Sequence, residues 1–313
     1  MKLFLHIGTE KTGTTTIQKA LGLNRDRLLD NGIYVPLSLG RSSHSKLVVY
    51  AMRPGIADPL LPNGRLDHQE KSALENKIRK ELHDEIHSIP SHVHTMIISC
   101  EHLHSRLFNI EEVQKVHELL QPHFSSISVV CYLRPQIDVA TSLYTTALRH
   151  GCTRSIQSFI ETHEKKKPLF YDYDQLLHRW ELVFSKKNIT VCHFNQKDFI
   201  NHHLLYDFCC RALHLHSDFV DKLDLSIHKE NKSLSKIGQS VLRLYNFAPR
   251  SVFEKAVSPN FSWRVIRFFS SIFSGKGQHL PNSFARIFQD KYKIENENVR
   301  SRYFPESNHL FNE

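Results

Sequence analysis

The chain has 313 residues, 40% of them hydrophobic, so it is long enough to build a large α/β domain with a proper core. Its 41 lysines and arginines exceed its 32 aspartates and glutamates, and the formal charge of +9 suits an anionic small molecule, glycan, nucleic acid or lipid headgroup. The sequence contains no leader-like opening, no apolar run long enough to cross a bilayer and no Cys-x-x-Cys pair. We therefore expect a cytoplasmic protein with buried free thiols and no metal centre.

The first residues predict a strand, an anion-binding loop and a helix. An apolar run over 2–8 leads into Gly8-Thr9-Glu10-Lys11-Thr12-Gly13, and apolar residues at helical spacing begin at Ile17. Glycines let loop N–H groups converge on an oxyanion, and a helix N-terminus adds its dipole and unpaired donors. Lys11 adds a positive charge and the threonines add hydroxyl donors. The residues that we expect at the anion are Gly8, Lys11, Thr12, Gly13, Thr14, Thr15 and Thr16.

Short strands alternate with helices along the first two thirds of the chain. Besides 2–8, strands are expected near 33–36, 95–100, 127–133 and 189–194. Helices are expected at about 15–30, 68–89, 110–122 and 175–184. This alternation predicts a parallel sheet with both faces covered. We expect a single domain, with an α/β core over 1–200 and a mainly helical C-terminal extension over 201–313.

Polar side chains follow the strand at 95–100. Glu101, His102 and His104 come directly after it, at the sheet edge where ligands of open parallel sheets gather. A carboxylate or an imidazole in that place can act as a general base, whereas a capping cluster for the next helix is the alternative. If the chain stays extended there, alternation places Glu101 opposite the two histidines. His44, in a polar segment expected at the same edge, is either a site residue or a surface histidine.

A second basic motif follows the strand at 127–133. Arg134 leaves that strand, and Ser142 lies eight residues later, about two helical turns on, so that a guanidinium and a hydroxyl can bind one phosphate. A Walker-type kinase would want an aspartate for magnesium in the position of Arg134. Arg149 ends the following helix, where it either lines an acceptor cleft or belongs to the helix terminus.

These motifs together resemble the sulfotransferases that use 3′-phosphoadenosine 5′-phosphosulfate (PAPS), in particular their bacterial, carbohydrate sulfotransferase-like members. Lys11-Thr12-Gly13-Thr14-Thr15 is similar to their 5′-phosphosulfate loop, and Arg134 with Ser142 is similar to their 3′-phosphate site. Glu10 departs from the proline or other neutral residue that is common there. The resemblance implies a P-loop-like three-layer fold with a helical C-terminal part. It also implies site roles for Lys11 and for Glu101, His102 or His104 in catalysis, for Ser233 near the nucleotide, and for His44 and Arg149 near the acceptor.

The activity implied by this resemblance is transfer of a sulfuryl group from PAPS to an acceptor hydroxyl or amine, expected on a glycan or glycolipid. The product would be adenosine 3′,5′-bisphosphate, and no metal is required. Two alternatives stay open: a P-loop nucleotide kinase, and a non-catalytic protein that binds anionic glycans or nucleic acid. Basic and aromatic residues are not interleaved as in RNA-binding proteins, so no nucleic-acid partner is expected.

One basic and aromatic segment lies near the C-terminus. Residues 261–273 contain two arginines and five aromatic residues, and the segment is too short to span a bilayer. It is either a buried helix or a contact with the inner face of a membrane that carries a lipid-linked acceptor.

Overall fold

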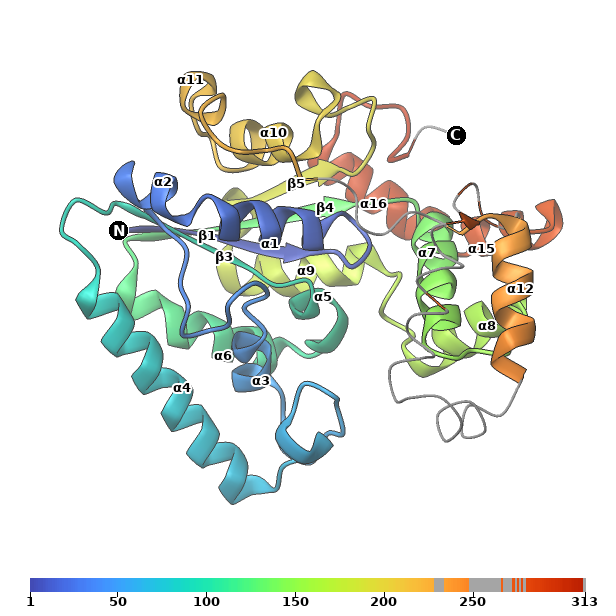
Figure 1. Ribbon diagram of the computed structural model, residues 1–313, viewed down its shortest axis with the longest axis horizontal. Helices are drawn as coiled ribbons and strands as arrows, with labels where there is room; N and C mark the ends of the chain where they lie inside the picture. Colours follow the sequence, from blue (N-terminus) through green and yellow to red (C-terminus); the bar gives the residue numbers. More distant parts are fainter. Residues whose placement is uncertain are drawn as a thin grey trace. The chain divides into compact units, whose positions relative to one another are not determined.

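The computed structural model describes residues 1–227, 234–247, 266, 272, 273, 275, 277 and 280–311. The chain forms two compact units, which we treat separately (Figure 1). Unit 1 comprises residues 1–134, 173–227 and 298–313, and unit 2 comprises 135–172 and 228–297. The long connection between the last two strands contributes residues 135–172 to unit 2, whereas its remainder from residue 173 belongs to unit 1.

Unit 1 is built on a five-stranded parallel sheet with the order β2-β3-β1-β4-β5. The central strand β1 (Lys2–Gly8) pairs with β3 (Thr95–Ser99) on one side and with β4 (Ser126–Leu133) on the other. β2 (Ile33–Tyr34) and β5 (Ile189–His193) form the two edges. All five strands lie where the hydrophobic pattern places them, which confirms the predicted α/β class. The carboxyl ends of β3, β1 and β4 are therefore neighbours at one edge of the sheet.

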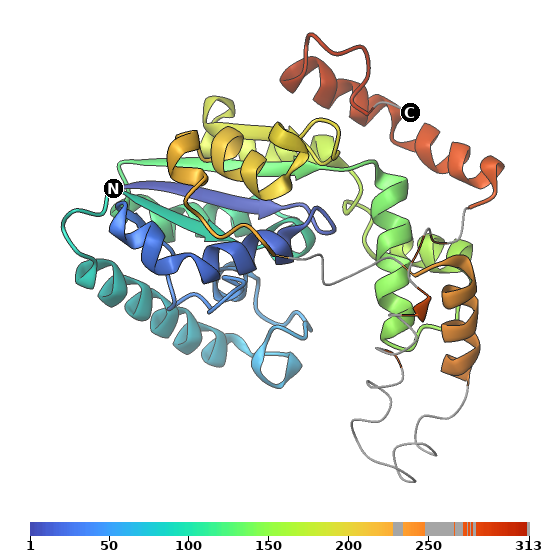
Figure 2. The same cartoon turned by 45° about the horizontal axis from the view of Figure 1, so that its top comes forward.

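Alternation along the strands supplies a core on each face of the sheet. In β1, Leu3, Leu5 and Ile7 contribute to one hydrophobic cluster, while Phe4 packs against the other. The first face is covered by α3 (Lys46–Ala51), α4 (His68–Ser88), α5 (His102–Arg106), α6 (Ile110–Leu120) and α9 (Tyr173–Phe184). The second face is covered by α1 (Thr14–Leu23), α2 (Arg25–Asp30), α10 (Leu204–Asp207), the π-helical turn η5 (Phe208–Ala212) and α11 (Ser217–Val220). In Figure 2 the blue α1 and the yellow segment that contains α10 lie on the same side of the sheet. Unit 1 is thus the expected three-layer arrangement.

The helix expected over 15–30 is interrupted at Asn24. This residue separates α1 from α2, and its side chain is almost fully buried. Its amide donates to the carbonyl oxygens of Ala20 and Asp224 at 2.9 and 2.8 Å, and its Oδ1 accepts from the Asp224 N–H at 2.8 Å. Asparagine side chains compete with helical backbone hydrogen bonds in this way, so the break has a local cause.

Four short helical turns lie in other connections of unit 1. They are η1 (Pro62–Gly64), η2 (Gln121–His123), η3 (Lys186–Asn188) and η4 (Ile200–His202). Residues 52–66 hold little regular structure beyond η1 and a single bridge between Ala57 and Arg65. All six cysteines are free, and four of them are buried.

Unit 2 is helical and has a hydrophobic cluster of its own. Among its described residues it has the helices α7 (Gln136–Arg149), α8 (Ile156–Lys166), α12 (Lys236–Phe247) and α15 (Asn282–Lys291), and α16 (Lys293–Tyr303) leads the chain back into unit 1. The Ser235 hydroxyl accepts the Gly238 N–H at 3.2 Å and so caps α12. Among the described residues, no helix has the length and apolar character needed to cross a membrane. Most of 261–273 lies outside the described residues.

Candidate active site

The loop between β1 and α1 is tied to β4, to the residue directly after β4 and to α5. Both the N–H and the hydroxyl of Thr9 donate to the Tyr132 carbonyl oxygen of β4, at 3.0 and 3.1 Å. The Glu10 N–H donates to Nδ1 of His104 on α5 at 3.3 Å. The Lys11 carbonyl oxygen accepts from Nη1 of Arg134, just beyond β4, at 3.3 Å. Three successive loop residues are thus held by the elements on either side of β1, and the loop shape is determined before any ligand binds.

Glycine is required at both ends of this loop. Gly8 and Gly13 have φ values of +103° and +74°, which side chains other than glycine rarely adopt. A Cβ on Gly13 would lie 2.3 Å from Leu204 Cδ2 and 3.1 Å from Phe194, and a Cβ on Gly8 would lie 3.1 Å from the Glu101 backbone. Gly8 therefore lets Glu101 approach the loop closely. Gly13 takes the N-cap position of α1 without a side chain that could cap the helix.

The four threonines of the motif differ in how they are placed. The Thr12 hydroxyl donates to the Thr9 carbonyl oxygen at 2.6 Å and is fully buried, so this side chain shapes the loop. Thr14 is buried, Thr16 is half-buried and Thr15 is exposed at the start of α1. The N–H groups in the first turn of a helix have no intrahelical acceptor, so this end of α1 offers donors and a positive dipole to an anion.

Glu101 is held beside the loop by a residue of α1. The chain turns at Glu101, with φ −65° and ψ −18°, and α5 begins at the next residue. The side chain does not cap α5. Its Oε2 instead accepts a hydrogen bond from Nε2 of Gln18 at 2.6 Å. The half-buried Glu101 carboxylate is thereby fixed next to the loop at the end of β3.

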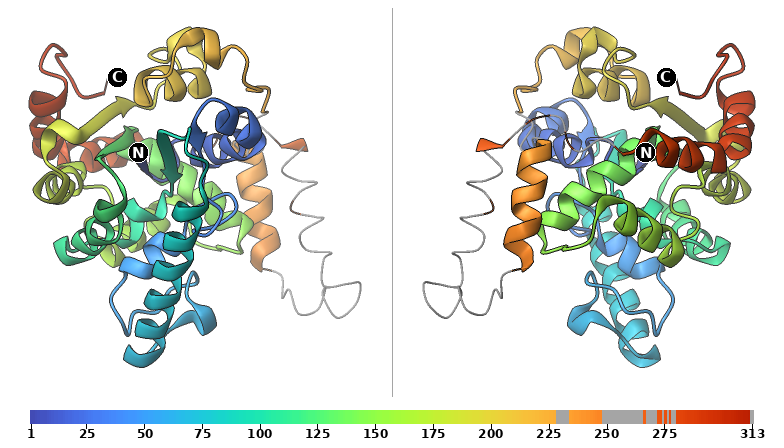
Figure 3. Two further views of the ribbon diagram at one scale, coloured as in Figure 1. Left: turned by 90° about the vertical axis from the view of Figure 1, so that its left-hand side faces the viewer. Right: turned by 90° about the vertical axis from the view of Figure 1, so that its right-hand side faces the viewer.

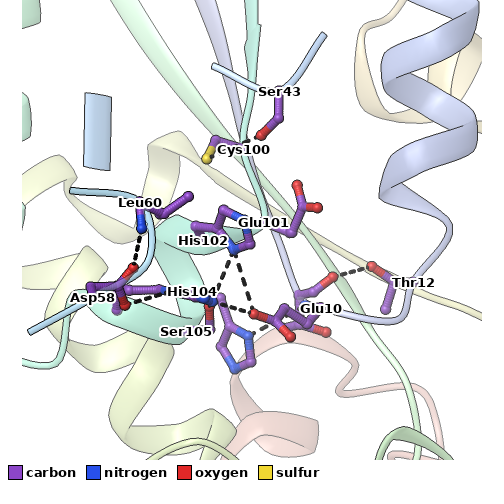
Figure 4. A network of polar contacts seen from close by, with 12 residues as sticks. Glu10, Thr12, Ser43, Asp58, Leu60, Cys100, Glu101, His102, His104 and Ser105 are labelled. Carbon is purple, nitrogen blue, oxygen red and sulfur yellow. Dashed lines mark hydrogen bonds and ion pairs between the residues drawn. The ribbon is translucent and has the colours of Figure 1, made fainter. Parts of the chain in front are cut away.

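The chain does not stay extended at Glu101, so the two histidines do not alternate with it along a strand. His102 and His104 lie on the helix α5 instead. His104 is buried, and its Nδ1 is used by the loop N–H of Glu10. His102 faces the Glu10 carboxylate, with Nδ1 3.5 Å from Oε1 (Figure 4). Both histidines thus contact Glu10. Among the three candidates, only Glu101 has its side chain held by α1, through Gln18.

Glu10, the departure from the family pattern, is neutralised within the protein. Nη1 of Arg106 lies 2.7 Å from Glu10 Oε1, and Nε of the same arginine lies 3.3 Å from Asp58 Oδ2. Burial alone would raise the pKa of Glu10, but hydrogen bonds from His102 and Ser105 and the charge of Arg106 outweigh it and hold that pKa far below its usual range. The network joins the loop to α5 and to the irregular segment 52–66 (Figure 4). A negative charge at position 10 is therefore balanced by Arg106, and it does not require Lys11 as its partner.

Arg134 occupies the end of β4, beside the loop. Besides its bond to the Lys11 carbonyl, its guanidinium lies over the Phe194 ring, 5.6 Å from the ring centre. Tyr173 donates its hydroxyl proton to the Arg134 carbonyl oxygen at 2.7 Å. Both the backbone and the side chain of Arg134 are thus positioned by neighbouring elements. The charges of Lys11 and Arg134 belong to the ends of adjacent parallel strands.

The remaining predicted residues fall in other places. His44 is fully buried, where Nδ1 accepts the Ser99 N–H at 2.9 Å and Nε2 donates to the Pro36 carbonyl oxygen at 3.0 Å, so we assign it no contact with an acceptor. Ser142 and Arg149 lie on α7 in unit 2, and burial lowers the pKa of Arg149. Ser233 lies outside the described residues. Within the described ranges, no three His, Cys, Asp or Glu side chains are grouped so as to hold a metal ion.

Two residues of this site were not anticipated from the sequence. Gln18 could have been found from the sequence, since it is a polar side chain on the apolar face of α1 between Ile17 and Leu21. No pattern in the sequence indicates Arg106, because its partners Glu10 and Asp58 are distant in the chain.

The solved structures that are similar to this chain include two sulfotransferases. The chain is similar to a sulfotransferase from Alicyclobacillus acidocaldarius, with 17% sequence identity, coverage of 83% of this chain and 98% of that one, and a TM-score of 0.43. It is also similar to mouse sulfotransferase SULT7A1 complexed with PAP, with 12% identity, coverage of 96% and 86%, and a TM-score of 0.41. No protein-family model and no curated protein sequence matches the chain.

Proposed function

We propose that the protein is a sulfotransferase that moves a sulfuryl group from PAPS to a hydroxyl or amine of an acceptor. The observation that carries this proposal is the meeting of three groups around one loop. Lys11 stands in the loop after β1, Arg134 at the end of β4 bonds to the Lys11 carbonyl, and Glu101 at the end of β3 lies on the other side. Two cations beside a carboxylate suit an anionic donor and an acceptor that must lose a proton.

The loop fits the 5′ end of such a donor. The two glycines give the loop its positive-φ turns, and the uncapped start of α1 supplies backbone donors. We assign this part of the site to Lys11, Gly13, Thr14, Thr15 and Thr16, with Gly8 and Thr12 shaping the loop. Arg134 is assigned to the 3′-phosphate, since a guanidinium binds a phosphate with two hydrogen bonds. The Phe194 ring packs against the Arg134 guanidinium. Ser142 and Ser233 stay predictions for the same nucleotide.

The residues of the site divide the chemistry between them. Glu101 takes the proton of the acceptor as its oxygen or nitrogen bonds to sulfur. Lys11 stabilises the negative charge that grows on the phosphate oxygen when its bond to sulfur breaks. Gln18 acts as a positioning residue, because its hydrogen bond holds the Glu101 carboxylate in one place. Positioning and charge stabilisation dominate such in-line transfers, and these residues supply both.

For the acceptor, we propose a glycan or glycolipid. The irregular segment 52–66 is tied to the loop by Asp58 and Arg106, so it would help to shape the acceptor side of the site. Arg149 stays a prediction for acceptor binding.

Calorimetric titration separates this function from the alternatives. The protein is titrated with adenosine 3′,5′-bisphosphate, with adenosine 5′-phosphate, and with ATP plus magnesium. We expect the bisphosphate to bind more tightly than the other two, by about tenfold or more, because Arg134 serves only the 3′-phosphate. Preference for ATP with magnesium would identify a kinase. Binding to heparin without binding of any nucleotide would identify a non-catalytic polyanion-binding protein.

A further inference from the structure

Nearly all of the net positive charge of the chain belongs to unit 2. By sequence, residues 135–172 and 228–297 contain 17 lysines and arginines against nine aspartates and glutamates, a formal charge of +8 out of +9 for the whole chain. Unit 1, which holds the anion loop and most of the residues, is close to neutral. The excess charge is therefore not explained by the donor site in unit 1. Concentrated in the smaller unit, it produces a positive field that attracts anionic surfaces.

Helix α12 of unit 2 presents an apolar stripe to solvent. Ile237, Leu244 and Phe247 are 65%, 70% and 62% exposed. Ile237 and Leu244 are seven residues apart, close to two helical turns, and Phe247 follows three residues later, so the three side chains share one face. The other face of α12 is buried within unit 2, where the helix packs against α7 (Figure 3). The stripe is thus not the side of the helix that builds the core.

Basic side chains border this stripe. Lys236 is exposed at the start of α12. The Arg243 guanidinium lies over the Phe247 ring, 6.0 Å from its centre, while its Nε donates to the Thr153 carbonyl oxygen at 2.8 Å. Arg243 therefore links the exposed ring to the body of unit 2.

Exposed apolar residues are also unevenly distributed between the units. Scattered single examples are ordinary on protein surfaces. Of the nine large hydrophobic side chains that are most exposed among the described residues, however, six belong to unit 2: Ile237, Leu244, Phe247, Ile272, Ile287 and Ile294. The same unit thus combines the net positive charge with most of the exposed apolar side chains.

We propose that unit 2 binds the surface of a lipid bilayer that contains anionic lipids. In this arrangement the apolar stripe of α12 enters the boundary between headgroups and acyl chains, and the exposed lysines and arginines in the described part of unit 2 contact the headgroups. A soluble polyanion such as an acidic polysaccharide would account for the charge but would leave the stripe in water. The proposal does not depend on the sulfotransferase assignment, because none of these residues belongs to the loop, Glu101 or Arg134.

Vesicle co-sedimentation of the full chain tests the proposal. We expect binding to vesicles of phosphatidylcholine mixed with phosphatidylglycerol, weaker binding to phosphatidylcholine alone, and a loss on addition of salt. The triple variant Ile237→Ser, Leu244→Ser, Phe247→Ser should bind the mixed vesicles about tenfold more weakly or worse, since each side chain loses apolar burial. The control is Leu23→Ser with Leu182→Ser in unit 1, at positions 58% and 60% exposed, and it should bind like the wild type.

Two further measurements keep the result decisive. Leu244→Glu alone changes a side chain that makes little contact with the core, so the protein should fold, and it should also lose vesicle binding. Retention on heparin is measured for every variant. Absence of binding to the mixed vesicles, or equal binding by wild type, Leu244→Glu and the triple variant, would overturn the proposal. Heparin retention without vesicle binding would do the same, and would assign the charge to a polyanion. Nucleotide titration of the same samples reports separately on the proposed function.

Discussion

Gln18 on α1 donates a hydrogen bond from Nε2 to Oε2 of Glu101 at the end of β3, over 2.6 Å. The two residues are 83 positions apart in the chain, and Gln18 is almost fully buried. This bond decides which of three adjacent polar residues is presented beside the anion loop, because His104 holds the loop and His102 belongs to the Glu10 network. The first two predictions follow from it.

Glu101→Gln should lower the rate of sulfuryl transfer by about 10²–10⁴-fold, because the amide cannot take the acceptor proton. Affinity for adenosine 3′,5′-bisphosphate should be preserved. Single-turnover assays and nucleotide titration measure the two quantities. The control Glu118→Gln makes the same change on the exposed side of α6 and should have no effect. Activity in Glu101→Gln together with a collapse in His102→Ala would move the role of base to His102.

Gln18→Glu should shift the acid limb of the pH–rate profile to higher pH. Two carboxyl groups in one site cannot both ionise readily, so the pKa of one of them rises and the base is protonated over a wider range. Gln18→Leu, which removes only the hydrogen bond, should lower kcat without this shift. Nucleotide affinity should stay unchanged in both variants. An unchanged profile in Gln18→Glu would mean that Glu101 is not the titrating base.

Lys11→Ala should lower turnover by about 10²–10³-fold or more, while nucleotide affinity falls less, since the ammonium acts most when charge grows on the departing oxygen. Lys11→Arg, which keeps the charge, should recover part of the rate. Lys2→Ala, an exposed lysine at the other end of β1, is the matched control. A near-normal single-turnover rate in Lys11→Ala would remove Lys11 from the chemistry.

Arg134→Ala should weaken binding of adenosine 3′,5′-bisphosphate by about 1.5–3 kcal/mol, the usual contribution of a charged hydrogen-bonded group. Binding of adenosine 5′-phosphate should change little, because it lacks the 3′-phosphate. Calorimetry with the two nucleotides gives the difference directly. Equal losses for both would mean that Arg134 acts only through its bond to the Lys11 carbonyl and its contact with Phe194.

Stability should fall on acidification through His44. Burial lowers the pKa of His44 to about 4, although backbone hydrogen bonds with Pro36 and Ser99 oppose this shift. The ordinary value is near 6.5, so between these two pH values the unfolded chain binds a proton that the folded chain does not. The free energy of unfolding therefore falls as pH drops from 6.5 to 4, by about 3 kcal/mol.

Denaturant titrations at a series of pH values measure this loss. His44→Gln should flatten the dependence of stability on pH over that range, although it also costs stability at neutral pH. His216→Gln, at a side chain that is 77% exposed, should leave the dependence as it is. His6, whose pKa burial lowers to about 3, contributes in the same direction and keeps some slope in every variant. Identical slopes in wild type and His44→Gln would contradict the assignment.

Local patterns in the sequence were enough to predict the five strands, the loop after β1 and the position of Arg134 directly after β4. Strand positions follow from runs of apolar residues. Gly8 and Gly13 predict a turn with positive φ angles, which other residues rarely adopt. Once the strands alternate with helices, a parallel sheet follows, and it brings Lys11 and Arg134 to one edge. These conclusions need only neighbours in the chain and the rules of sheet topology.

Only the tertiary structure decided how the side chains at that edge are used. The φ and ψ angles at Glu101 start a helix, which cancels the alternation expected for an extended chain. Gln18, Arg106 and the burial of His44 depend on partners that are distant in sequence, so no local pattern reveals them. The concentration of charge in unit 2 likewise appears only when the contacts divide the chain. Secondary structure can be predicted from periodicity over a few residues, because it depends on neighbours in the chain. The orientation of a side chain depends on the residues that pack against it, which are often distant in the sequence.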